Sequence, residues 1–146
     1  MSMSKMVFIN LPVSDVGRAT AFYEELGARK NPQFSDATAS CMVISDTIHV
    51  MLLSHEKFRQ FTPRPIADAR AATEVLVCLS CDSRAEVDDL VSRATKRGGK
   101  ADPGPKQDYG FMYGRSFEDL DGHIWEVMWM DVAAMQDAQS KSPTAA

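Results

Sequence analysis

The feature that most constrains the fold of this chain is an order of predicted elements that occurs twice: a strand, a helix and then further strands. Asp15 can cap the helix of the first half. Asp82 stands at the matching point of the second half, just before a Ser83–Glu86 capping box. Short apolar runs separated by turn residues predict the strands. They cover residues 7–13, 29–34, 41–45, 48–53, 75–81, 111–118 and 123–130.

A half of this size has little core of its own, so we expect the halves to form one domain. The predicted fold class is α+β, with two βαβββ modules forming a curved, half-barrel mixed sheet and the helices outside. The modules cover residues 6–61 and 73–131, and the proline-containing segment 62–72 links them. A short helix is predicted from Asp131. The domain would span residues 1–138, followed by a disordered tail at 139–146.

Composition excludes several classes of function. The chain has 146 residues and a net charge of -4 without a basic stripe, so a nucleic-acid partner is not expected. No apolar run approaches the roughly 18 residues of a membrane span. The N-terminus carries no apolar signal core, so we expect a cytoplasmic protein. The odd set Cys41, Cys78 and Cys81 argues against a disulfide framework.

Two local motifs resemble those of a known superfamily. The run Asn10-Leu-Pro-Val-Ser-Asp15, followed by Ala21-Phe-Tyr23 and Leu26-Gly27, resembles the opening of vicinal oxygen chelate proteins. The run Asp119-Leu-Asp-Gly-His-Ile-Trp-Glu126 resembles their closing motif, Asp-Pro-Asp-Gly-x-x-x-Glu. This is the glyoxalase, bleomycin-resistance and extradiol-dioxygenase group. The resemblance covers about residues 6–131, is closest to a glyoxalase-like subfamily, and implies a homodimer.

In metal-dependent members of this superfamily, four side chains on the concave sheet face hold one divalent metal such as Zn²⁺, Ni²⁺ or Mn²⁺. Carried over to this chain, the four positions fall at Phe8, Met51, Leu76 and Glu126. Only Glu126 can donate an electron pair of the kind that these metals prefer. The resemblance therefore predicts a protein without the full metal site. A shifted register would bring His49 in, because it shares the face of Met51.

Glu126 has two interpretations. It is either a structural carboxylate bonded by Asn10, Ser116 or a tyrosine hydroxyl, or a general base whose pKa is raised by apolar neighbours. Alternation predicts the rest of the concave face, which is largely apolar. That face would hold Phe8, Asn10, His49, Met51, Leu76, Cys78, Met112, Ser116, Ile124, Glu126 and Met128.

Two classes of function follow. The first is a binding protein that takes a small organic molecule into a largely apolar cleft. Tyr109 and Tyr113 would close the mouth of that cleft, or alternatively pack a dimer interface; with Phe8 and Trp129 they are the candidate stacking surfaces. The alternative is a metal-dependent lyase or isomerase of the lactoylglutathione lyase type, with Glu126 as catalytic residue. A regulatory subunit without a small ligand is the third possibility.

Overall fold

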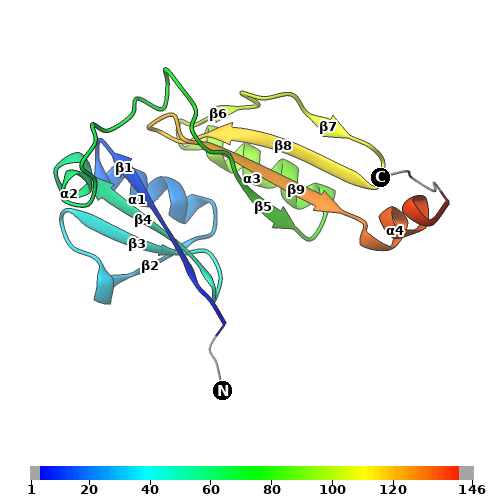
Figure 1. Cartoon of the computed structure of the whole chain (residues 1–146), viewed down its shortest axis with the longest axis horizontal. Helices are drawn as coiled ribbons and strands as arrows, with labels where there is room; N and C mark the ends of the chain where they lie inside the picture. Colours follow the sequence, from blue (N-terminus) through cyan, green and yellow to red (C-terminus); the bar gives the residue numbers. More distant parts are fainter. Residues whose placement is uncertain (1–3, 142–146) are drawn as a thin grey trace. The chain divides into compact units, whose positions relative to one another are not determined.

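The computed structural model describes residues 4–141, which divide into two compact units. Unit 1 holds the chain up to Glu74 together with the turn Asp119–His123, and unit 2 holds Val75–Glu118 and the chain from Ile124 onward. Each unit contains a mixed sheet with a helix packed against it (Figure 1). Within the described residues, no helix combines the length and the apolar character needed to cross a membrane.

Unit 1 contains a four-stranded sheet in the order β1-β4-β3-β2, in which β1 runs parallel to β4 and the other pairs are antiparallel. Its elements are β1 (Val7–Val13), α1 (Val16–Glu25), β2 (Arg29–Asn31), the 3₁₀ turn η1 (Pro32–Phe34), β3 (Ala39–Val43), β4 (Ile48–Ser54) and α2 (His55–Arg59).

Helix α1 begins and ends where its sequence directs. The Asp15 side chain accepts a hydrogen bond from the backbone N–H of Arg18 at 3.0 Å, which caps the first turn. Gly27 follows the helix with a φ of +100°, a conformation that favours glycine. The apolar side of α1 contacts β3 and β4, and the core of unit 1 lies between them. Its most deeply buried side chains are Val13, Ala19, Phe22, Met42, Val50 and Leu52.

Unit 2 has a sheet in the order β5-β9-β8-β6, with β7 also paired to β8. Strand β5 runs parallel to β9, and β8 is antiparallel to β9. Helix α3 packs on one face, where Val87, Val91 and Ala94 are buried together with Phe117 and Trp125. The elements are β5 (Val77–Cys81), α3 (Arg84–Lys96), β6 (Lys100–Ala101), β7 (Gln107–Asp108), β8 (Met112–Glu118), β9 (Ile124–Met130) and α4 (Val132–Lys141).

The predicted fold class is confirmed: the chain is α+β, built from two modules with open sheets and a helix against one face of each. Several boundaries differ, and the strand predicted at 41–45 is observed as β3 at Ala39–Val43. The strand predicted at 29–34 ends at Asn31, because Pro32 starts a 3₁₀ turn. Strand β5 starts at Val77, so Leu76 lies outside it. Helix α4 continues to Lys141, into the predicted tail, and residues 142–146 lie outside the described part of the chain. The single domain of residues 1–138 stays a prediction.

Candidate ligand-binding site

The face of the unit 2 sheet that lies away from α3 carries a small hollow around Glu126. Glu126 lies on the central strand β9, and its cross-strand partners are Cys78 on β5 and Ser116 on β8. Directly paired residues project to the same face of a sheet, and so do residues two positions along a strand. Gly114 and Met128, which pair with each other, therefore share the face of Glu126.

We call this hollow the sheet-face pocket. It has a cavity volume of about 90 Å³ and is lined by Cys78, Gly104, Pro105, Gln107, Met112, Gly114, Arg115, Ser116, Glu126, Val127 and Met128. The loop that follows β6 closes one side. There the backbone N–H of Gly104 donates to Ser116 Oγ at 3.1 Å, and the N–H of Asp102 donates to the Ser116 carbonyl at 2.8 Å. The pocket is thus mostly apolar with one ionisable carboxylate.

The Glu126 carboxylate is half-buried, and none of the described residues of unit 2 donates a hydrogen bond to it. Ser116 was one of its expected partners, but the hydroxyl oxygen of Ser116 accepts the N–H of Gly104. Burial raises the pKa of the neighbouring Cys78 thiol, and the negative charge of Glu126 adds to that effect. A carboxylate has room for several donors. Glu126 therefore presents open acceptor capacity to the pocket.

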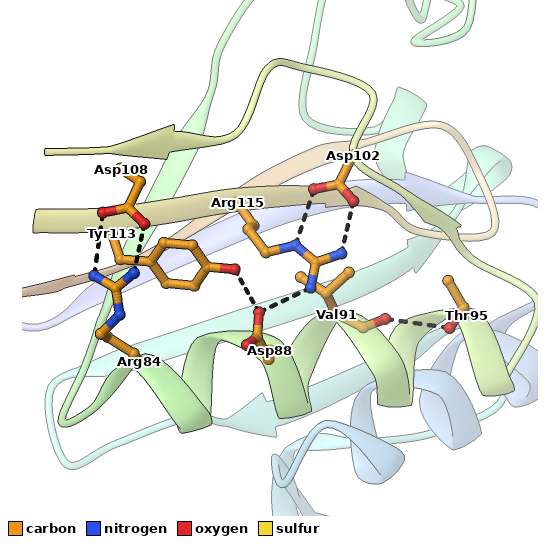
Figure 2. Close-up of polar contacts among 8 residues, drawn as sticks. All are labelled: Arg84, Asp88, Val91, Thr95, Asp102, Asp108, Tyr113 and Arg115. Atoms are coloured by element: carbon orange, nitrogen blue, oxygen red, sulfur yellow. Dashed lines mark hydrogen bonds and ion pairs between the residues drawn. The ribbon is translucent and has the colours of Figure 1, made fainter. Parts of the chain in front are cut away.

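Tyr113 does not line this pocket, because it projects from the opposite face of β8. Its hydroxyl donates to Asp88 on α3 at 2.6 Å (Figure 2). Arg84, also on α3, stands over the Tyr113 ring at 4.4 Å and at 5.8 Å from the Trp129 ring. Trp129 is thus held on the α3 side as well. Tyr109 is 61% exposed and stacks on Phe111 with ring centroids 6.4 Å apart.

Arg115 shares the α3 side and is the centre of an ion-pair network there. Its guanidinium donates to Asp102 at 2.7 and 3.0 Å and to Asp88 at 2.9 Å (Figure 2). The hydrogen bond from Arg115 lowers the pKa of Asp102. The pKa of Asp88 is lowered first by the bond from Tyr113 and then by Arg115. Arg115 partly neutralises both acids and joins Asp88 of α3 to the sheet, so the network supports the packing of α3.

The predicted site residues of unit 1 gather on the open face of its own sheet. Phe8 on β1 pairs with His49 on β4, and their rings stack with centroids 4.5 Å apart. Asn10 pairs with Met51 and donates from Nδ2 to the Phe8 carbonyl at 3.5 Å. His49 is buried, and its Nδ1 has no hydrogen-bond partner among the described residues. Leu76 precedes β5 and is 55% exposed.

The side chains present do not fit the four-ligand metal site of the superfamily. Phe8, Met51 and Leu76 occupy three of the four ligand positions and offer no donor that Zn²⁺, Ni²⁺ or Mn²⁺ prefers. Across the described residues 4–141, no three side chains of His, Cys, Asp or Glu lie close enough together to hold a metal ion. Among the four ligand positions of the superfamily, Glu126 is therefore a single carboxylate.

Comparison with known proteins decides the family. The model of the Glyoxalase/Bleomycin resistance protein/Dioxygenase superfamily matches residues 5–127. The chain belongs to this superfamily. The resemblance drawn from the two sequence motifs is thus confirmed. A search of the curated proteins finds no match to the chain.

Several solved structures share the fold. Hypothetical protein SA1046 from S. aureus is 25% identical with a TM-score of 0.71, over 88% of this chain and 95% of that chain. A family enzyme from Burkholderia phytofirmans PsJN is 16% identical with a TM-score of 0.70, over 87% and 99%. The fosfomycin resistance protein FosX from Listeria monocytogenes is 20% identical with a TM-score of 0.62, over 88% and 92%.

Sequence reasoning missed the loop that closes the sheet-face pocket. Gly104, Pro105 and Gln107 line the pocket, although the sequence marked Asp102-Pro-Gly-Pro105 only as a loop. The contact of Gly104 with Ser116 depends on the course of that loop, which local sequence does not encode. The alternation of side chains along β8 could have placed Tyr113. Its neighbours Met112 and Gly114 face the pocket, so Tyr113 between them must face α3.

Proposed function

We propose that this protein binds a small organic molecule through the sheet-face pocket, with an amino group or another hydrogen-bond donor of the ligand directed at Glu126. The observation that supports this proposal is a half-buried glutamate, set among Met112, Met128 and Pro105, to which none of the described residues donates a hydrogen bond. Its carboxylate oxygens are accessible to solvent rather than buried, so a ligand can reach them. A ligand that supplies the donor therefore gains binding free energy from a group that is already in place.

The volume of the pocket and the net charge of the protein limit which ligands can bind. A volume of about 90 Å³ is well below the 300–1,000 Å³ of typical ligand pockets. The pocket would accordingly hold one end of the ligand, while the rest extends from it. The methionines suit an aromatic or thioether group next to the donor, because their sulfurs contact ring edges favourably. The net charge of -4 favours the approach of a cation.

A lyase or isomerase of the lactoylglutathione lyase type is the second candidate. It rests on the same feature, because a carboxylate free of internal donors is also what a general base requires. In this case Glu126 would remove the proton from the hydroxyl- and sulfur-bearing carbon of a thiohemiacetal, next to the carbonyl, and return it to the former carbonyl carbon to give a 2-hydroxy thioester. Turnover of a thiohemiacetal that is lost in Glu126→Gln would support this candidate, with Zn²⁺, Ni²⁺ and Mn²⁺ added separately.

The binding proposal is tested by calorimetric titration with benzylamine and with benzyl alcohol, which has no positive charge. We expect benzylamine to bind the wild-type chain more tightly. Glu126→Gln should lower the affinity for benzylamine by about tenfold or more, because a charge-assisted hydrogen bond is lost. It should leave the affinity for benzyl alcohol nearly unchanged. Glu24→Gln, on the exposed side of α1, is the matched control and should bind both probes as the wild type does. Equal benzylamine affinity in Glu126→Gln would refute the proposal.

A further inference from the structure

A second cavity lies wholly within unit 1 and has no part in the function proposed above. Its volume is about 440 Å³, inside the range of small-molecule sites. Its walls are the end of β1, one side of α2, the linker residues 65–70 and the turn between β8 and β9. We call it the linker pocket, because the linker forms its largest wall.

The linker wall is held on the turn by specific contacts. Arg70 donates from its guanidinium to the Leu120 carbonyl at 2.6 Å, and its backbone N–H donates to Asp68 Oδ1 at 3.0 Å. The linker passes directly over Gly122, where an added Cβ would lie 2.7 Å from Arg70 Cγ. Only glycine permits this approach, and its φ of +87° favours glycine as well. The linker wall is therefore packed and hydrogen-bonded against the rest of unit 1.

The turn is joined to the opposite wall in the same way. The backbone N–H of Ser14 donates to Asp121 Oδ1 at 2.8 Å. His123 Nε2 lies 2.8 Å from the Pro12 carbonyl, to which it donates. These bonds hold the end of β1 against the turn and fix the place of Asp121 in the pocket wall.

The groups of the pocket that remain unpaired are segregated by charge. His55 and Arg59 lie four residues apart on α2, hence on one side of the helix, and no described residue pairs with either side chain. Asp68 and Asp121 lie on the linker and the turn. Each uses Oδ1 for a backbone N–H, and no described residue donates to either Oδ2. The α2 wall therefore offers donors, and the linker and the turn offer two acceptor oxygens beside the Arg70 guanidinium, which is bonded to the Leu120 carbonyl.

This segregation decides between ligand classes. A phosphate or another multiply charged anion would meet Asp68 and Asp121, and a simple cation would meet Arg59; each leaves like charges opposed. A molecule with a carboxylate at one end and an ammonium group at the other satisfies both walls. We propose that the linker pocket binds a free amino acid or a similar small zwitterion, with its carboxylate toward Arg59 and His55 and its ammonium group toward Asp68 and Asp121.

The test is ligand-observed NMR on the full chain with each standard L-amino acid in turn. We expect at least one to bind. Its N-acetyl derivative, which lacks the ammonium group, and its amide, which lacks the carboxylate, should each bind about tenfold more weakly or not at all. Arg59→Gln and Asp121→Asn should each lower the affinity for the amino acid by about tenfold. Arg64→Gln, an exposed arginine of the linker that does not line the pocket, is the control and should bind normally.

Three results would each overturn the proposal: no amino acid binds, the amide binds as tightly as the acid, or Arg59→Gln binds as tightly as the wild type. Circular dichroism of each variant establishes that it is folded. If Asp121→Asn unfolds the chain, Asp68→Asn tests the acidic wall instead. Glu126→Gln should leave amino-acid binding unchanged, so failure here and failure of the sheet-face proposal are separate results.

Discussion

The open faces of the two sheets differ, although the same order of elements builds both. In unit 1, Phe8 and His49 are paired across β1 and β4 and their rings stack. In unit 2, Cys78 is the partner of Glu126 across β5 and β9, where unit 1 has the pair of Asn10 and Met51. Gly114 leaves space beside them. A few side chains on one face therefore decide whether a sheet is covered by aromatic rings or opens into a pocket.

The two buried or half-buried carboxylates of these units differ just as clearly. Asp119 in unit 1 is only 4% exposed and accepts three hydrogen bonds. The Tyr23 hydroxyl donates at 2.5 Å, and the backbone N–H groups of Asp121 and His123 donate at 2.9 Å. Glu126 receives none from the described residues of unit 2. The difference indicates that Asp119 stabilises the fold and that Glu126 is available for a ligand.

Asp119→Ala should have the largest effect. It leaves three donors without an acceptor in a buried place, which should lower the free energy of unfolding by about 3 kcal/mol or more. Urea denaturation measures the loss. Asp46→Ala, in the exposed turn between β3 and β4, is the control and should change stability by less than about 0.5 kcal/mol. Equal effects of the two changes would break the distinction between structural and available carboxylates.

Arg115→Met should come next. Its side chain is 15% exposed, and the change leaves Asp102 and Asp88 without their shared cation. We expect a loss of about 2 kcal/mol, less than for a fully buried pair because both acids keep contact with water. Arg84→Met removes an ion pair of which both members are nearly half-exposed, so its effect should be clearly smaller. A cost for Arg84→Met that matches the cost for Arg115→Met would contradict the assigned roles.

Two glycines give a sharper contrast between the units. Gly122→Ala forces a Cβ against the linker at a positive φ, and it should cost about 1–3 kcal/mol. Gly114→Ala meets neighbours only at 3.7 Å or more, so the fold should tolerate it. The added methyl group would narrow the sheet-face pocket and lower its affinity for benzylamine. Thermal unfolding and calorimetry separate these outcomes. If Gly114→Ala destabilised the chain as much as Gly122→Ala, the pocket would not be open space.

The pH dependence of stability should have opposite signs in the two units. Burial raises the pKa of Asp119, so its contribution is full below the pKa of an unfolded aspartate, about 3.9, and is lost as the pH rises through the folded pKa. The Arg115 hydrogen bond lowers the pKa of Asp102, so its contribution is present above the unfolded pKa and is lost as the pH falls through the folded one.

Substitution by asparagine measures each contribution. The cost of Asp119→Asn should shrink as the pH rises from about 3.5 to 7, and the cost of Asp102→Asn should grow over the same range. Urea unfolding at each pH gives both slopes. This should be the smallest of the predicted changes in the free energy of unfolding, because Asp102 is partly exposed. Slopes of the same sign would contradict the assigned environments.

The sequence predicted much of the fold, because local signals determine it. The apolar run at residues 7–13 and the helix cap after it predicted β1 at its observed bounds. The capping residue Ser83 predicted where α3 begins. Strands β6 and β7 span two residues each, too short for any periodic pattern. The predicted site residues stay a prediction. The register that pairs Cys78 with Glu126 depends on tertiary strand pairing, which local sequence does not encode. The linker pocket depends on the course of a segment without periodicity.

The most direct test of the central claim is methyl NMR of methionine-labelled protein titrated with benzylamine. The methyl groups of Met112 and Met128 line the sheet-face pocket, whereas Met42 is fully buried in the core of unit 1. We predict that the Met112 and Met128 signals move with one saturating curve, that Met42 stays in place, and that Glu126→Gln suppresses the movement. Unmoved Met112 and Met128 signals at benzylamine concentrations that saturate binding would contradict the account.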